Sequence, residues 1–188
     1  MNRNAPDQYS ALGLALHWVT AIVVLTAFIY GPGGPEARVY SPARDFDRQL
    51  HETLGLVVFT LVLLRMAWRA GAVIPTTTPG PRWQMRAARL VQFAMYVLMV
   101  ALPVTAVTGA WLEGHPLTLL TGVEVAPRLA QWHAAGAVIA EIHGWLGDTI
   151  MWLAGLHAAA GLYHHFVLRD GVLASMLPGW LVRRRPAP

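Results

Sequence analysis

Four histidines lie within long apolar stretches of this chain of 188 residues, at positions His17, His51, His143 and His157. An ionisable side chain inside a membrane-spanning segment is energetically costly, so it usually faces the interior of a helix bundle and has a specific partner there. The chain has no cysteine, which excludes disulfides, iron–sulfur clusters and thiolate zinc sites. Imidazole is therefore the side chain best suited to bind a metal or a metal-containing cofactor.

The two later histidines of this set belong to one predicted helix. His143 and His157 are 14 residues apart. At 100° per residue, 14 residues return to within about 40° of the same face, and at 1.5 Å per residue they separate the two rings by about 21 Å. A single helix thus offers two ligands at two depths.

The composition indicates that these helices lie in a membrane. Apolar residues make up 55% of the chain and charged residues only 13%, whereas about 25% of the residues of a soluble domain are charged. This balance excludes an independent soluble enzyme domain. Four apolar runs predict an all-α, integral membrane four-helix bundle that forms a single domain over residues 1–188, with spans at about 10–30, 50–68, 90–111 and 142–168.

The arginines predict the orientation of the bundle. Ten of the fourteen lie before the first span, around the second connection or after the fourth span: Arg3, Arg65, Arg69, Arg82, Arg86, Arg89, Arg169, Arg183, Arg184 and Arg185. Because positively charged loops stay in the cytoplasm, both termini are predicted to be cytoplasmic. The net charge of +4 is thus explained by topology, and no nucleic-acid partner is expected.

This topology places the four histidines in two pairs. His17 and His157 share the cytoplasmic depth, whereas His51 and His143, at the starts of the second and fourth spans, share the outer depth. Two facing pairs suit two haems with two axial imidazoles each, whereas zinc needs three or four ligands at one point. The alternative is that each histidine is a hydrogen-bonded residue of the bundle interior.

Two further side chains are candidates near the cytoplasmic side. Arg65 follows His51 by 14 residues on the same face, where its guanidinium could pair with a haem propionate; the alternative is an arginine that extends to the membrane surface. His164 follows His157 by seven residues, within about 20° of its face. There it could hydrogen-bond a quinone carbonyl or deliver a proton, or it could be an interfacial histidine without a role.

The connection between the third and fourth spans is the longest. Its stretch from Pro127 to Ala140 predicts a short amphipathic helix on the outer membrane surface, and His115 and His133 are expected to be solvated. In the third span, Pro103 predicts a kink or a freed carbonyl. Gly109 predicts close helix packing, within the chain or in a homodimer.

Several motifs resemble a known family. They are Tyr9-Ser10 with Leu16-His17-Trp18, Ala101-Leu102-Pro103, and Gly155-Leu156-His157-Ala158-Ala159-Ala160 followed by His164-His165. They are similar to those of the bacterial cytochrome b561 family, which includes the membrane superoxide oxidases, and the resemblance covers nearly the whole chain. It implies a di-haem b-type cytochrome of the bacterial inner membrane. In it, His17 and His157 match the iron ligands of the cytoplasmic haem, and His51 and His143 match those of the outer haem.

The resemblance also implies an activity. Superoxide would be oxidised at the outer haem, ubiquinone would accept the electrons, and His164 would be the catalytic residue that serves the quinone. An anion such as superoxide is steered by a positive surface, yet the outer connections hold four arginines against at least six carboxylates. These arginines could still cluster over the haem edge and make the entrance positive; they are Arg38, Arg44, Arg48 and Arg128.

Two other functions stay open. The chain could be a passive electron carrier, either as a cytochrome subunit of a dehydrogenase or as the partner of a periplasmic donor. It could also be a non-redox bundle, which predicts no bound haem and leaves the four histidines unexplained. The expected partners are the lipid bilayer, a quinone, and superoxide or another electron donor, with a protein partner also possible.

Overall fold

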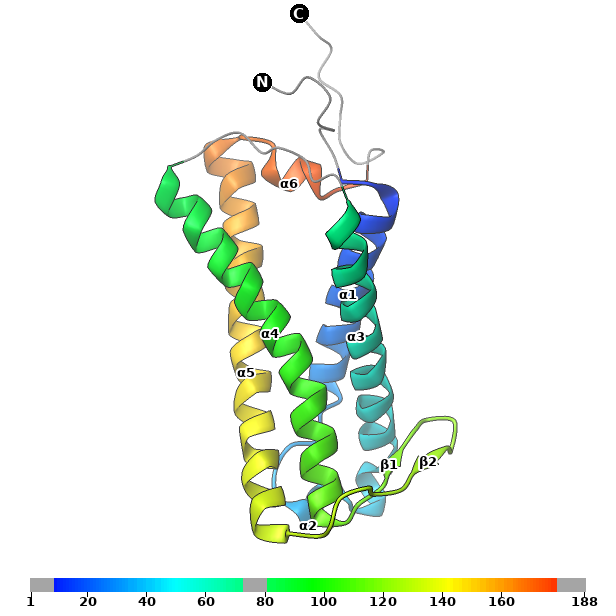
Figure 1. Cartoon of the computed structure of the whole chain (residues 1–188). Coiled ribbons are helices and arrows are strands. Elements are labelled where there is room, and N and C mark those ends of the chain that lie inside the picture. Colours follow the sequence, from blue (N-terminus) through cyan, green and yellow to red (C-terminus); the bar gives the residue numbers. More distant parts are fainter. Residues whose placement is uncertain (1–8, 73–80, 179–188) are drawn as a thin grey trace, which may run out of the picture.

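The fold is dominated by four long helices. The computed structural model describes residues 9–72 and 81–178, and its long helices are α1 (Ala11–Ile29), α3 (Asp45–Gly71), α4 (Arg82–Glu113) and α5 (His133–Tyr163). They run along a common direction, with the short elements gathered at the two ends (Figure 1). The prediction of an all-α helix bundle is confirmed.

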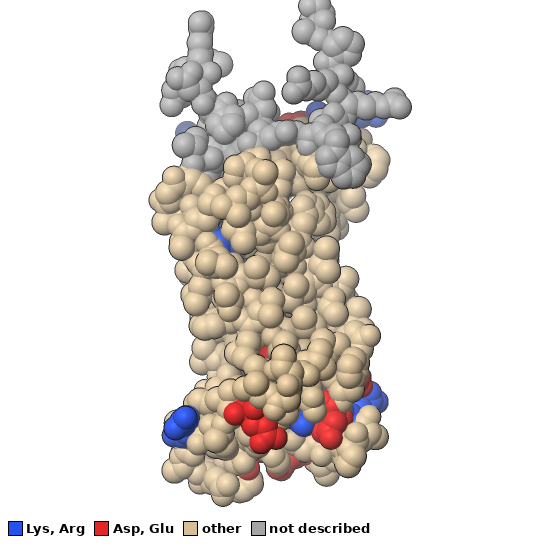
Figure 2. Space-filling view, turned by 90° about the vertical axis from the view of Figure 1, so that its right-hand side faces the viewer, with Lys and Arg blue, Asp and Glu red and all other residues tan. Residues whose placement is uncertain are grey.

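The outside of the bundle suits a lipid environment. Among the described residues, three segments are long and apolar enough to cross a membrane: α1, Pro42–Gly71 and α4. Helix α5 has 31 residues, enough to cross a hydrocarbon core about 30 Å thick, and it exposes Trp152 and Trp145 to 81% and 68%. Figure 2 shows charged side chains gathered at the end that carries α2 and the hairpin, with almost none on the middle of the visible face. The chain is therefore a membrane helical bundle.

The helices pack as two pairs, α1 along α3 and α4 along α5, and α3 joins the pairs by contacting α4. The buried core lies at mid-depth and is formed by Val58, Val62, Leu98, Met99 and Ile150. Ile150 is seven residues from both His143 and His157 along α5. A dry apolar layer thus separates the two levels at which the histidines lie.

Two glycines allow α4 and α5 to approach closely. A Cβ atom at Gly136 of α5 would lie 3.0 Å from the backbone nitrogen of Glu113 and 3.2 Å from the carbonyl oxygen of Gly109. A Cβ at Gly109 would lie 3.3 Å from the backbone nitrogen of Ala140. The predicted close packing at Gly109 is confirmed, and it joins two helices of the same chain.

Short elements close both ends of the bundle. At one end lie α2 (Glu36–Val39), the 3-10 turn η1 (Pro42–Arg44) and a hairpin of β1 (Leu117–Thr118) and β2 (Glu124–Val125). The strands are antiparallel, and Leu117 is opposite Val125. At the other end, α5 continues into the π-helical turn η2 (His164–Leu168), which is followed by α6 (Val172–Ser175).

The described chain begins and ends at the same end of the bundle. The backbone N–H of Tyr9 donates to the carbonyl oxygen of Ser175 at 3.3 Å, and the indole N–H of Trp18 donates to that of Met176 at 2.8 Å. This agrees with an even number of membrane crossings. That this end is cytoplasmic stays a prediction, and four of the arginines behind it lie outside the described residues: Arg3, Arg183, Arg184 and Arg185.

The helix boundaries differ from the predicted spans most clearly in α5. The predicted surface helix from Pro127 to Ala140 is wrong, because residues 133–140 form the first turns of α5. Gly136 and Ala140 contact α4 in this stretch, so its small residues serve helix packing. His133 accordingly begins a helix, although its side chain is exposed as expected.

The α4–α5 crossing gives a first prediction. Alanine normally stabilises a helix relative to glycine by roughly 0.5–1 kcal/mol, but overpacking a tight contact costs about 1–3 kcal/mol. We therefore expect Gly136→Ala to lower the thermal unfolding temperature of the purified protein. Gly144→Ala on the same helix, where an added Cβ meets no atom within 4 Å, is the control and should raise it or leave it unchanged. Equal effects of the two substitutions would contradict the close crossing.

Candidate functional site

The structure brings the four intramembrane histidines together in two pairs. The ring centroids of His17 on α1 and His157 on α5 are 6.3 Å apart. Those of His51 on α3 and His143 on α5 are 5.9 Å apart. The rings are steeply inclined to each other in both pairs, by 72° and 90°. Each pair bridges the α1/α3 and α4/α5 halves of the bundle, with α5 contributing one ring at each level.

In the His51–His143 pair, backbone carbonyls fix both rings through the Nδ1 atoms. His51 Nδ1 lies 2.7 Å from the carbonyl oxygen of Ala27, and His143 Nδ1 lies 3.0 Å from that of Leu102. A carbonyl only accepts, so each Nδ1 carries the proton and each Nε2 keeps a free lone pair. The Ala27 carbonyl belongs to the last turn of α1, where helix carbonyls lack intrahelical partners. Metal-binding histidines are commonly oriented by such a bond from the second ring nitrogen.

An apolar cavity lies beside this pair. His51 and His143 line it together with Val24, Phe28, Pro103, Gly55 and Gly147. Each of these glycines follows its histidine by four residues, one helical turn further on, and a Cβ at either position would meet no atom within 4 Å. Both glycines thus keep open space beside the imidazoles.

The other pair is contacted by an arginine. Arg65 Nη1 lies 3.0 Å from His17 Nδ1, and the Arg65 guanidinium carbon is 5.8 Å from the centre of the Tyr96 ring. Arginine has only donors, so Nδ1 of His17 accepts here and a neutral ring carries its proton on Nε2. The buried Tyr96 hydroxyl has no hydrogen-bond partner among the described residues. Sequence reasoning missed Tyr96, because a tyrosine in an apolar span gives no signal of its own.

The spacing within each pair fits a single ion between two imidazoles. A metal–nitrogen bond is about 2 Å long and the nitrogen lies about 1 Å from the ring centre, so two imidazoles on opposite sides of one ion have centroids about 6 Å apart. No hydrogen bond joins the two rings in either pair, and within residues 9–72 and 81–178 no third His, Asp or Glu completes a zinc-like group with them. These residues fit a haem iron held by two axial imidazoles, with the open cavity beside the His51–His143 pair.

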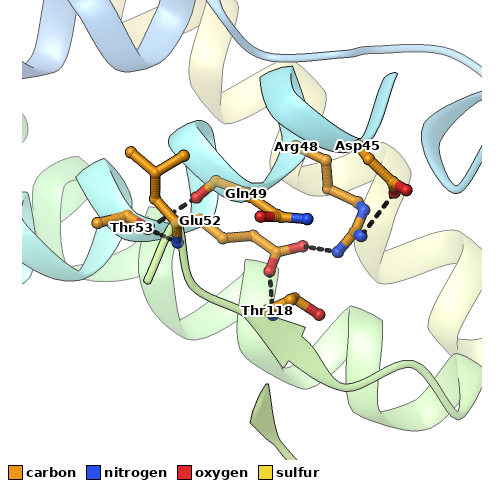
Figure 3. A network of polar contacts seen from close by, with 7 residues as sticks. Asp45, Arg48, Gln49, Glu52, Thr53 and Thr118 are labelled. Carbon is orange, nitrogen blue, oxygen red and sulfur yellow. Dashed lines mark hydrogen bonds and ion pairs between the residues drawn. The ribbon is translucent and has the colours of Figure 1, made fainter. Parts of the chain in front are cut away.

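A polar network that includes Glu52 of the cavity wall lies at the end that carries the hairpin; Figure 3 shows its contacts. Glu52 lines the cavity, accepts from the backbone N–H of Thr118 at 2.6 Å and pairs with Arg48 at 3.1 Å. Arg48 also pairs with Asp45 at 2.9 Å, and the Thr53 hydroxyl accepts from the backbone N–H of Leu120. The network therefore ties the hairpin segment to the first turns of α3.

At the end that carries the hairpin, Arg44 and Arg48 are paired with carboxylates of α3. Arg48 is only 9% exposed and is held by Asp45 and Glu52, and Arg44 pairs with Asp47 at 2.8 Å. Arg48 also lies over the ring of Tyr40, 5.3 Å from its centre. Burial raises the pKa of the Tyr40 phenol well above its usual range, and the Glu52 and Glu113 carboxylates raise it further. Two of the four arginines that could form a positive entrance are thus neutralised.

At the opposite end, His164 makes a contact that sequence reasoning missed. Its Nδ1 lies 2.5 Å from Oδ2 of Asp170, and the backbone N–H of Val172 donates to Oδ1 of the same carboxylate at 3.2 Å. Although partial burial opposes ionisation, these hydrogen bonds outweigh it and lower the pKa of Asp170. The π-helical turn that begins at His164 and the following loop bring the two side chains together.

Comparison with known proteins agrees with this arrangement. A family model described as prokaryotic cytochrome b561 matches residues 8–179. "Cytochrome b561 homolog 2" of Escherichia coli K12 is 27% identical, with 93% of each chain covered. "Cytochrome b562" of Cereibacter sphaeroides is 30% identical over 90% of this chain and 94% of its own length. "Probable superoxide oxidase CybB" of Yersinia pestis is 25% identical over 91% of this chain and 96% of its own.

The match spans all four long helices and both histidine pairs, and it agrees with the motifs around His17 and His157. The chain therefore belongs to the prokaryotic cytochrome b561 family, a family of membrane proteins that bind haem b and transfer electrons.

Proposed function

We propose that the chain holds two haem b groups, one between His51 and His143 and one between His17 and His157, and transfers electrons across the bacterial inner membrane. The observation that carries this proposal is the pair of imidazole–imidazole gaps of about 6 Å, one at each end of a single apolar core. Haem supplies a reversible one-electron change at iron, and the protein supplies ligation, burial and orientation.

The chain's own residues orient the imidazoles that would hold the haem irons. The carbonyl oxygens of Ala27 and Leu102 hold the proton on Nδ1 of His51 and His143. Nε2 of each ring therefore keeps a free lone pair with which it can bind a metal ion. The apolar core between the two levels excludes water, and low polarity around a haem is one of the means by which a protein sets its potential.

Arg65 has a different role in this proposal. Ligation through Nε2 requires the proton of His17 to move to Nδ1, which can then no longer accept from Arg65. The guanidinium is then free to pair with a haem propionate, for which its planar array of donors is well suited. The unpartnered hydroxyl of Tyr96, whose ring lies beside Arg65, is a second donor available at this level.

We propose ubiquinone as the electron acceptor at the end that carries His164. Reduction of a quinone to a quinol takes two electrons and two protons, so a proton-carrying group is needed beside it. The Asp170 carboxylate accepts a hydrogen bond from Nδ1 of His164. Nε2 is thereby left to hydrogen-bond a quinone carbonyl and exchange a proton with it. His164 is the proposed catalytic residue, and Asp170 positions it.

For the electron donor we propose superoxide, which becomes O₂ when it gives up one electron, so that two superoxide ions reduce one quinone. This assignment is supported by the similarity to the relative named as a probable superoxide oxidase. It places oxidation at the His51–His143 level and quinone reduction at the His17–His157 level.

The charge at the outer end favours a second candidate, an electron carrier that receives electrons from a protein partner. Arg44 and Arg48 are paired with carboxylates, while Glu36 and Glu124 add negative charge at the same end. An acidic surface repels an anion but attracts a basic partner protein. The alternative uses the same haems and differs only in the donor.

Haem content tests the paired ligands. We expect purified wild-type protein to bind two haem b groups per chain and His143→Ala to bind one or fewer, because one axial imidazole of the outer pair is lost. The measurement is haem and protein quantification with oxidised and reduced visible spectra. His165→Ala, an exposed histidine outside both pairs, is the matched control and should retain two.

A cavity-filling variant sharpens the same test. Gly147→Leu keeps every imidazole but fills the space beside the His51–His143 pair, so it should also lose the outer haem. Gly144→Leu adds the same side chain at an exposed position of α5 that does not line the cavity, and should bind two haems. A wild type without haem, or a haem count unaffected by His143→Ala, would exclude the proposal.

The quinone end predicts a separation of catalysis from haem binding. We expect His164→Ala to slow ubiquinone reduction by roughly 100-fold or more, a typical value for loss of acid–base catalysis, while both haems remain. Asp170→Asn should slow it less, because the imidazole stays in place. The measurement is quinol formation after chemical reduction of the haems, with His165→Ala as the control. Loss of both haems in His164→Ala would instead assign this histidine a structural role.

The electron donor is tested with the isolated chain. We expect superoxide generated in solution to reduce ubiquinone in vesicles that contain only this protein and lipid. Because the outer end is acidic, raising the ionic strength should screen the repulsion and increase the rate, measured as initial quinol formation. A rate no greater than that of protein-free vesicles would favour the carrier, which needs its partner.

A further inference from the structure

Three potential metal ligands meet outside the haem levels, at the end of the bundle that carries α2 and the hairpin. They are Glu36, Glu113 and His115, and one ligand atom of each lies within 4.8 Å of the others. None of the three lines the cavity beside His51 and His143. The cluster therefore needs an explanation of its own.

The backbone brings these side chains together from two distant parts of the sequence. Glu36 is the first residue of α2, and Glu113 is the last residue of α4. Gly114 follows in the left-handed conformation at φ 89°, which only glycine adopts readily, and it turns the chain so that His115 comes back beside Glu113. The backbone N–H of His115 donates to the carbonyl oxygen of Ala110 at 2.9 Å and fixes this turn.

The imidazole of His115 is held in one orientation. The ring of Tyr40 stacks on it, with centroids 3.5 Å apart and planes 17° from parallel. Its Nε2 lies 2.6 Å from Oε1 of Glu36. One ring nitrogen is thus already directed at a carboxylate of the cluster, which it now contacts directly by a hydrogen bond.

Glu113 gives an independent indication that a cation belongs here. The residue is only 8% exposed, and its Cγ packs against Gly136, where a Cβ atom would lie 2.6 Å away. No hydrogen bond or ion pair to its carboxylate is present in residues 9–72 and 81–178, apart from the nearness of Glu36 and His115. Two carboxylates that share one site repel each other unless a cation or a proton compensates them.

We propose that Glu36, Glu113 and His115 bind one divalent transition-metal ion of the zinc class. One imidazole nitrogen and two carboxylate oxygens form a mixed donor set that zinc accepts, whereas magnesium and calcium prefer oxygen ligands alone. Two ligands of a tetrahedral zinc ion lie about 3.3 Å apart, so a small movement of the half-exposed Glu36 side chain brings the three atoms into range. Water completes the coordination.

The test is zinc binding by tag-free, haem-loaded protein that has first been treated with a chelator. Isothermal titration with Zn²⁺ should show one saturable site per chain, and thermal unfolding should move to higher temperature when Zn²⁺ is added. Glu113→Gln and His115→Ala should each weaken binding by at least tenfold and abolish the thermal shift. Haem content and spectra of each variant should equal those of wild type, which shows that the bundle is intact.

Two matched controls make the outcome decisive. Glu124→Gln removes an exposed carboxylate of the neighbouring hairpin and His165→Ala removes a histidine at the opposite end, and both should bind Zn²⁺ as wild type does. Absence of a saturable site in wild type would overturn the proposal. So would binding that survives both Glu113→Gln and His115→Ala, which would place the ion elsewhere. Without metal, Glu113→Gln should unfold at a higher temperature than wild type. If this difference disappears when Zn²⁺ is added, the ion compensates the charge of Glu113.

Discussion

Each imidazole buried in this apolar bundle has two ring nitrogens, and each nitrogen needs a partner. In the His51–His143 pair the protein supplies half of these partners from its backbone, through the carbonyl oxygens of Ala27 and Leu102. The remaining nitrogens of His51 and His143 belong to rings whose spacing leaves room for an ion and too wide a gap for a direct hydrogen bond. The unsatisfied ring nitrogens are what supports the proposal that the pairs bind haem and are not merely core histidines.

Helix α5 sets the distance between the two levels. It supplies one ring to each pair, and the 14 residues between His143 and His157 correspond to about 21 Å along the helix. The close crossing with α4 at Gly109 and Gly136 fixes the depth of α5 in the bundle. Small residues at this contact therefore help to place both histidine pairs although they lie outside them.

Much of this arrangement follows from the sequence, because helix periodicity and topology are local or nearly local properties. The four helices, the pairing of the histidine depths and the packing at Gly109 could all be predicted. The start of α5 could not, since small residues that face a lipid surface and small residues that face another helix give the same pattern. The contact of Tyr96 with Arg65 depends on tertiary approach, and that of Asp170 with His164 on the π-helical turn and loop between them; no spacing rule encodes either. The Arg48–Glu52 ion pair could have been predicted, because opposite charges at i and i+4 of one helix commonly pair.

The outer end shows two uses of the same charges in competition. Arg48 pairs with Glu52, and Glu52 in turn holds the hairpin through the backbone N–H of Thr118. This pairing cancels the positive charge of Arg48. A guanidinium left free at this end would attract an anion, but Glu52 would then keep only the backbone N–H of Thr118 as a partner for its charge in the cavity wall, which is destabilising. The arrangement therefore favours firm attachment of the hairpin segment to α3, at the expense of attraction of an anion to this end. Under the proposed function, superoxide would reach the His51–His143 level by diffusion alone, whereas a basic protein partner would be drawn to the carboxylates at this end of the bundle.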